Sequence, residues 1–112
     1  MTQYNPDKWL IVKLTATDTH TVHYRVFGTW SGGYLDGDSW KLNSGITAVT
    51  VDADGYYHFT GSSGSVYICH PRAYGSTGYG HSVLHSLIAR RADSVTIEAL
   101  SEETDFMTLD YK

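Results

Sequence analysis

The sequence contains a single cysteine, Cys69, and few basic side chains, and each of these shortages excludes a class of protein. One cysteine cannot form an internal disulfide, so no disulfide within the chain stabilises the fold. Only eight lysines and arginines stand against twelve acidic residues, which gives a formal net charge of −4. This balance argues against broad nucleic-acid binding, because contacts along a phosphate backbone require a stripe of positive charge.

Long apolar runs are also missing, and none approaches the length that crosses a membrane. The chain starts without a basic segment followed by an apolar one, as a secretory signal would. We therefore expect a reduced, cytoplasmic protein with no membrane partner. Its 112 residues suffice for one domain with a modest hydrophobic core. We predict a single domain over residues 1–112, with a loosely held acidic tail from about residue 101.

Apolar runs bounded by turn residues predict most of the secondary structure, and residues 22–27 also alternate between two faces. The expected strands are 9–14, 22–27, 46–51, 56–60, 65–69 and 94–100, and helical spacing of apolar residues predicts a helix over 81–91. Residues 28–45 show no clear periodicity, so we expect a long loop there, interrupted by a short strand around 39–42.

These elements predict an α+β fold. We expect a single antiparallel sheet of about five to six strands, made of a hairpin and a three-stranded meander. One helix from the C-terminal half is expected to pack on one face of that sheet.

Histidines provide the first candidate chemistry. His81 and His85 lie four residues apart on the predicted helix and could share a metal ion, with His70 as a third ligand. No glutamate follows His81, and no acidic residue stands at a spacing typical of a metal site. We therefore predict that these histidines are surface residues and that the protein binds neither a metal nor another cofactor. An enzyme that uses two of these histidines, or His58, as acid and base is an alternative.

Cysteine chemistry and ligand loops are weaker candidates. Cys69 and His70 are neighbours in a strand and point to opposite faces, which favours a core cysteine, and we predict no catalytic residue. The loop Gly61–Ser65 could hold an anion, with Arg72 as the nearest cation in sequence, although a hairpin turn is favoured. Asp36–Asp38 begins like a calcium loop but lacks the bidentate glutamate at the twelfth position.

Aromatic side chains on glycine-rich segments are the strongest signal for binding. We expect Trp9 and Trp40 in the core, whereas tyrosines that sit among glycines have no apolar periodicity to bury them. Exposed aromatic residues commonly anchor a partner or stack on a planar ligand. The predicted binding residues are Trp30, Tyr34, Asp36, Asp38, Ser62, Ser63, Arg72, Tyr74 and Tyr79.

Two runs of the sequence, Gly37–Ile46 and Gly64–His70, resemble small proteins encoded by phages and prophages. The resemblance implies a compact accessory protein of the host cytoplasm that blocks a host function, frequently a defence system, by binding one of its components. We therefore predict a non-enzymatic inhibitor that binds an unidentified host protein through its Gly/Tyr-rich loops. The alternative is a sponge that sequesters a small nucleotide-like signal, which a symmetric homo-oligomer would favour. A small histidine-based hydrolase or nuclease is the third hypothesis.

Overall fold

The strands form two separate four-stranded sheets in the computed structural model, which describes residues 2–33 and 37–111. The elements of this part of the chain are β1 (Gln3–Tyr4), β2 (Lys8–Ala16), β3 (Val22–Gly33), β4 (Gly37–Leu42), β5 (Ile46–Val51), β6 (Tyr57–Gly61), β7 (Val66–Cys69), α1 (Gly78–Arg91) and β8 (Val95–Ala99). One sheet has the order β1-β7-β6-β5 and is called the β6 sheet here; the other has the order β4-β3-β2-β8 and is called the β2 sheet. The β6 sheet is mixed, because β1 runs parallel to β7.

The predicted single antiparallel sheet is wrong. The expected hairpin is present as β2 and β3, and the expected meander is present as β5, β6 and β7, but the two belong to different sheets. The chain passes from one sheet to the other in the corner between β4 and β5, at residues 43–45. Gly45 has φ +124° there, in a region of backbone space that side chains disfavour.

Residues 28–45, expected as a loop, are in large part an extension of the β3–β4 hairpin. Antiparallel pairing runs from Phe27 opposite Leu42 to Trp30 opposite Ser39. The register then shifts between Trp30 and Gly33, which marks a bulge. Glycines and a bulge weaken the two-residue period, so this hairpin is hidden in the sequence pattern.

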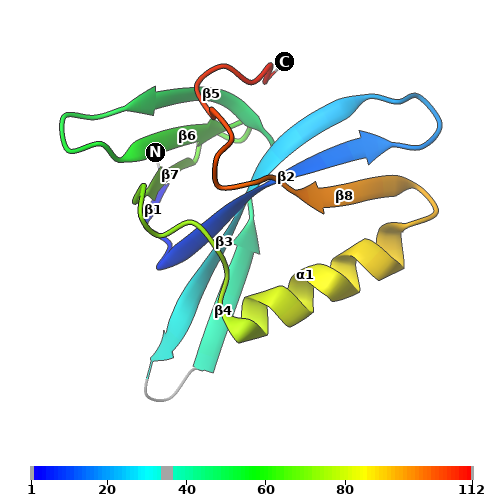
Figure 1. Ribbon diagram of the computed structural model, residues 1–112, viewed down its shortest axis with the longest axis horizontal. Helices are drawn as coiled ribbons and strands as arrows, with labels where there is room; N and C mark the ends of the chain where they lie inside the picture. Colours follow the sequence, from blue (N-terminus) through cyan, green and yellow to red (C-terminus); the bar gives the residue numbers. More distant parts are fainter. Residues whose placement is uncertain (1, 34–36, 112) are drawn as a thin grey trace.

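The molecule has three layers, which are the β6 sheet, the β2 sheet and helix α1. Strand β2 lies in the middle layer and is buried on both faces. Trp9 and Ile11 point into a core shared with the β6 sheet, and Leu10 and Val12 point into a second core under the helix. Figure 1 shows β2 between these two layers, with β5 and β6 on one side and α1 on the other. All four side chains are at most 9% exposed.

Helix α1 begins at Gly78, three residues before the predicted start, and packs on the β2 sheet. The Thr77 hydroxyl caps the helix by accepting a hydrogen bond from the Gly80 backbone N–H at 3.0 Å. Leu84 and Leu87 are buried against Val12, Phe27 and Ile97 of the sheet. No helix in the described ranges is long and apolar enough to span a membrane.

The C-terminal tail is not loosely held along its whole length, contrary to expectation. Phe106 is 3% exposed and lies in the core between the two sheets. The Tyr111 hydroxyl donates a hydrogen bond to the Phe106 carbonyl, which fastens the last turn of the tail. The acidic side chains Glu102, Glu103 and Asp105 remain exposed.

Candidate functional site

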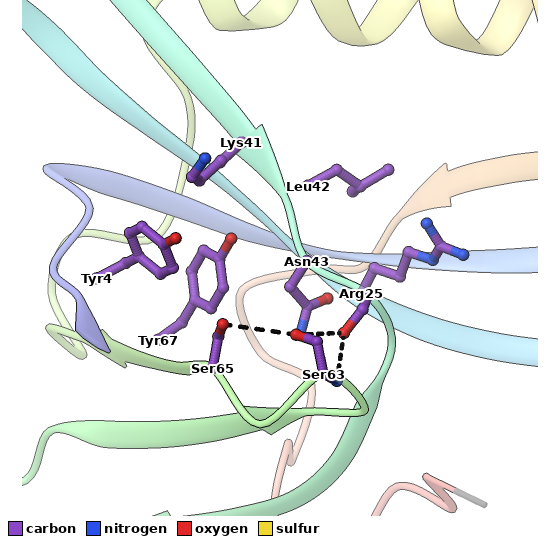
Figure 2. A pocket seen from close by; sticks show the side chains of 9 residues that line it. Tyr4, Arg25, Lys41, Leu42, Asn43, Ser63, Ser65 and Tyr67 are labelled. Carbon is purple, nitrogen blue, oxygen red and sulfur yellow. Dashed lines mark hydrogen bonds between the residues drawn. The ribbon is translucent and has the colours of Figure 1, made fainter. Parts of the chain in front are cut away.

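A polar pocket opens where the two sheets meet, and we call it the Asn43 pocket. Its lining residues are Tyr4, Arg25, Lys41, Leu42, Asn43, Ser44, Ser63, Ser65 and Tyr67. They come from β1, β3, β4, β7, the corner between the sheets and the β6–β7 turn, as Figure 2 shows. The volume of about 270 Å³ lies just below the range of about 300–1,000 Å³ that is typical of small-molecule sites.

The charge of the Asn43 pocket is opposite to that of the whole chain. Arg25 and Lys41 are two of only eight basic residues, and none of the described residues lining the pocket is acidic. Among the side chains that the structure describes, one ion pair joins His58 to Asp52, and it involves neither Arg25 nor Lys41. The pocket is therefore an electropositive site on an acidic protein.

Asn43 contributes a buried donor that lacks a partner. Its side chain is 4% exposed, and its Oδ1 accepts hydrogen bonds from the backbone N–H groups of Val26 at 2.8 Å and Gly45 at 3.4 Å. These two bonds fix the orientation of the amide, so the Nδ2 group cannot exchange places with the oxygen. Nδ2 itself is buried with no hydrogen-bond partner among the described residues, and the same is true of Arg25 Nε.

Two tyrosines form the aromatic wall of the Asn43 pocket. The rings of Tyr4 and Tyr67 lie 5.0 Å apart at 35°, and Lys41 Nζ lies 5.2 Å from the centre of the Tyr4 ring. Burial, with a smaller contribution from Tyr4, raises the pKa of Tyr67 to about 12. Tyr67 therefore stays protonated near neutral pH and keeps its hydroxyl as a hydrogen-bond donor.

A second pocket adjoins the first, and we call it the Trp30 pocket. It is lined by Tyr4, Trp30, Ser39, Trp40 and Lys41, and it shares Tyr4 and Lys41 with the Asn43 pocket. Trp30 is held in place by a hydrogen bond from its indole N–H to the Asn5 carbonyl at 2.9 Å. Trp40 is half-buried and stacks on Phe27 at 5.7 Å, so it belongs both to this pocket and to the edge of the core. Trp9, at 1% exposure, is a core residue as predicted.

The serine-rich turn between β6 and β7 is not a backbone nest for an anion. The N–H groups of Gly61, Ser62 and Gly64 donate to backbone carbonyls at 2.8–2.9 Å, and the Ser63 N–H donates to the Ser44 hydroxyl at 3.0 Å. With these four donors already used, the turn lacks the row of free N–H groups that a nest requires, and its hydroxyl groups remain available to a ligand. The interpretation of this loop as a hairpin turn is confirmed.

The structure separates the predicted polar site residues. Ser63 lines the Asn43 pocket, whereas Ser62 lines a neighbouring pocket with Ser44 and Tyr111. Arg72 is exposed and lines neither of these pockets, so Arg25 and Lys41 are the cations near the serine turn instead. Of the remaining predicted binding residues, Tyr34 and Asp36 lie outside the residues that the structure describes. Asp38 lies in β4, and the structure does not describe its side chain.

The two tyrosines near the helix have different environments. Tyr74 packs edge-on against Trp9 at 4.8 Å, and its hydroxyl donates to the Leu100 carbonyl at 2.6 Å. Burial is also the main reason that the pKa of Tyr74 is raised. Tyr74 is therefore a structural residue, contrary to its predicted role as an exposed anchor. Tyr79, the second residue of α1, is 45% exposed.

Cys69, His58 and His70 each make separate contacts, whereas His81 and His85 lie close together on α1, with their Nε2 atoms 3.1 Å apart. Cys69 is fully buried, and burial raises the pKa of its thiol far above the usual value, so it is a core residue. His58 bonds to Asp52, while the His70 ring packs edge-on against Tyr56 at 4.8 Å. No group of three or more metal-ligating side chains occurs within the described ranges.

No protein-family model matches the chain, and searches of the curated proteins and of the solved structures found no significant match. The sequence did not predict most of the residues that line the Asn43 pocket. Arg25 has the pattern of a residue on the polar face of a strand, and Tyr4 lies before the first predicted strand. The one available signal was Asn43-Ser44-Gly45, a polar turn directly after an apolar strand residue.

Proposed function

We propose that this protein is a non-enzymatic binding protein that holds a small, nucleotide-like anion across the Asn43 and Trp30 pockets. The observation that carries the proposal is the buried Asn43 Nδ2 group without a hydrogen-bond partner. Leaving such a donor unpaired costs about 1–3 kcal/mol. A ligand oxygen that reaches past the exposed Ser63 side chain would satisfy this donor and offset that cost.

The charge of the site favours an anion. Arg25 and Lys41 supply two positive charges without a described carboxylate partner. Figure 2 shows Lys41 on the tyrosine side of the pocket, while the Arg25 guanidinium points away from Ser63 and Ser65. Hydrogen bonds that involve a charged group are about twice as strong as neutral ones. A phosphate group would therefore be bound better here than a neutral group of the same size.

The adjoining Trp30 pocket favours a planar ring next to that phosphate. Trp30 and Trp40 line it, and Tyr4 and Lys41 belong to both pockets, so one ligand can contact both. A base stacked on an aromatic side chain gains about 1–3 kcal/mol. A phosphate joined to a planar base has this combination of groups, which supports the hypothesis of a sponge for a nucleotide-like signal in the host cytoplasm.

Calorimetric titration with adenosine monophosphate, adenosine and inorganic phosphate tests the proposal. We expect the nucleotide to bind more tightly than either of its halves. Lys41→Gln or Ser63→Asp should weaken nucleotide binding about tenfold or more, because a hydrogen bond to a charged group is worth about 1.5–3 kcal/mol.

Two matched controls remove or add the same charge away from the pockets. Arg90→Gln and Ser86→Asp change exposed positions on α1 and should leave the affinity unchanged. Absence of binding for all three probes, or an equal loss in the control variants, would contradict a ligand site at this place.

The inhibitor hypothesis stands as a second proposal, and the exposure of Tyr79 is the observation that favours it. An exposed aromatic residue at the start of a helix can anchor a partner protein. Affinity capture from host lysate with the wild type and Tyr79→Ala tests this. A host protein retained in equal amount by both would show that Tyr79 is not the anchor.

A further inference from the structure

We propose that His81 and His85 form a two-histidine site for a divalent transition-metal ion such as Cu²⁺ or Zn²⁺. The site lies on the solvent-facing side of α1 and is independent of the ligand pockets described above. The Nε2 atoms of the two rings lie 3.1 Å apart, and the ring centres lie 4.6 Å apart. Both histidines are exposed, so an ion can reach them from solvent.

The separation of the two Nε2 atoms matches the distance between two nitrogen ligands bound to one metal ion. Metal–imidazole bonds of about 2.0–2.1 Å that meet at an angle of about 100° place the two nitrogens about 3.1 Å apart. The rings therefore already have the spacing that chelation requires, and the ion would replace the hydrogen bond between the two Nε2 atoms. Each ring would keep its proton on Nδ1 and use Nε2 as the ligand.

The surroundings leave room for an ion and for its remaining ligands. Gly78 and Ala89, one turn before His81 and one turn after His85, are exposed and small. The first turn of α1 contains no acidic residue, and the basic residues Arg90 and Arg91 lie in the last turn. Water or a small external ligand would therefore complete the coordination, which makes this a labile surface chelate rather than a structural metal centre.

The choice of metal follows from the ligand type. Imidazole nitrogen suits copper, zinc and nickel, and the general order of affinity places Cu²⁺ above Ni²⁺ and Zn²⁺. Calcium and magnesium prefer oxygen ligands, so neither is expected to bind. Chelation should also raise the melting temperature, because the ion clamps two successive turns of α1 in the folded state only.

The test is calorimetric titration of the full chain with Cu²⁺, and then Zn²⁺, in a buffer that does not chelate. We expect one ion per chain for the wild type. The decisive variant combines His85→Ala with Ser86→His, which keeps six histidines but moves the pair out of register on the helix. Affinity should fall by about tenfold or more, because the loss of a direct ligand costs at least as much as the roughly 10–100-fold cost of losing an outer-shell partner.

The exposed pair His20 and His23 supplies the matched control. Replacing both by alanine should leave the affinity and the metal-induced rise in melting temperature unchanged. Circular dichroism checks that each variant keeps its helix. The proposal is overturned if the register-shifted variant binds as tightly as the wild type, if the His20/His23 variant loses binding, or if the wild type binds neither ion.

Discussion

Asp52 holds the turn between β5 and β6 with both of its carboxylate oxygens. Oδ1 accepts hydrogen bonds from the N–H groups of Asp54 at 2.9 Å and Tyr56 at 3.0 Å, and Oδ2 lies 2.8 Å from His58 Nε2. The bond to His58, followed by the bond from Tyr56, lowers the pKa of Asp52 below its usual value of 3.8. The resulting stabilisation is therefore present above the unfolded-state pKa and is lost as the pH falls through the lower folded-state value.

Replacing Asp52 by Asn tests this contribution. Asparagine keeps an oxygen for the two turn N–H groups but carries no charge to hold His58. We expect a small loss of unfolding free energy near neutral pH, and the gap between variant and wild type should close as the pH falls below about 4. Urea unfolding over a pH series measures the gap. The control Asp54→Asn should show no such closing, and a constant gap for Asp52→Asn would contradict the mechanism.

Single residues also show where sequence reasoning reached its limit for the site. Tyr74 and Tyr79 both stand beside glycines, yet Tyr74 is half-buried and packs against the core, whereas Tyr79 is exposed. The difference arises from the pairing of Tyr74 with Trp9, a contact across 65 positions that no local pattern contains. The donors of the Asn43 pocket were missed for the same reason, since they meet only when the two sheets come together.

Strands were easier to predict than sheets. Apolar and β-branched runs bounded by turn residues located β2, β5, β6 and β7 to within a few residues, because this signal depends only on the local sequence. Pairing between strands depends on the path of the chain, and here the corner at residues 43–45 sends it into a second sheet. The continuous apolar run Trp9–Val12 did carry a hint, since such a run is typical of a strand buried on both faces.

Helix α1 depends on one of its two glycines for close packing against β3. A Cβ atom at Gly80 would collide with Thr29 Cγ2 and would lie 2.7 Å from Ser76 Oγ, whereas a Cβ atom at Gly78 would meet nothing within 4 Å. Thr29 is fully buried and has no room to move. The same substitution should therefore have opposite effects at these two positions of one helix.

We expect Gly80→Ala to lower the unfolding free energy by about 1–3 kcal/mol through overpacking. Gly78→Ala should raise it by about 0.4–1 kcal/mol, because alanine restricts the unfolded chain and favours the helix. Chemical denaturation of both variants, with circular dichroism as the probe, measures the two effects. A Gly80→Ala protein as stable as the Gly78→Ala protein would show that the helix does not pack against Thr29 this closely.

The last segment of the chain helps to join the two sheets. Phe106 enters the core between the sheets and lies within 5.4–6.4 Å, between ring centres, of Trp9, Tyr57, Phe59 and Tyr74. These four rings come from both sheets and from the segment before α1, so one tail residue contacts three parts of the fold. The tail therefore closes the core that the sheets leave open at this end.

Phe106→Ala should therefore destabilise the whole molecule and not only the tail. Removing a fully buried phenylalanine costs about 3–5 kcal/mol, a large share of the 5–15 kcal/mol that typically stabilises a domain. Met107→Ala is the matched control, because its side chain is 47% exposed and should be nearly neutral. Thermal unfolding followed by tryptophan fluorescence reports on the core directly, since Trp9 contacts Phe106. We expect Phe106→Ala to unfold at a much lower temperature than Met107→Ala, because the core between the sheets is incomplete without Phe106. Equal unfolding temperatures for the two variants would show that the tail is only attached to the surface.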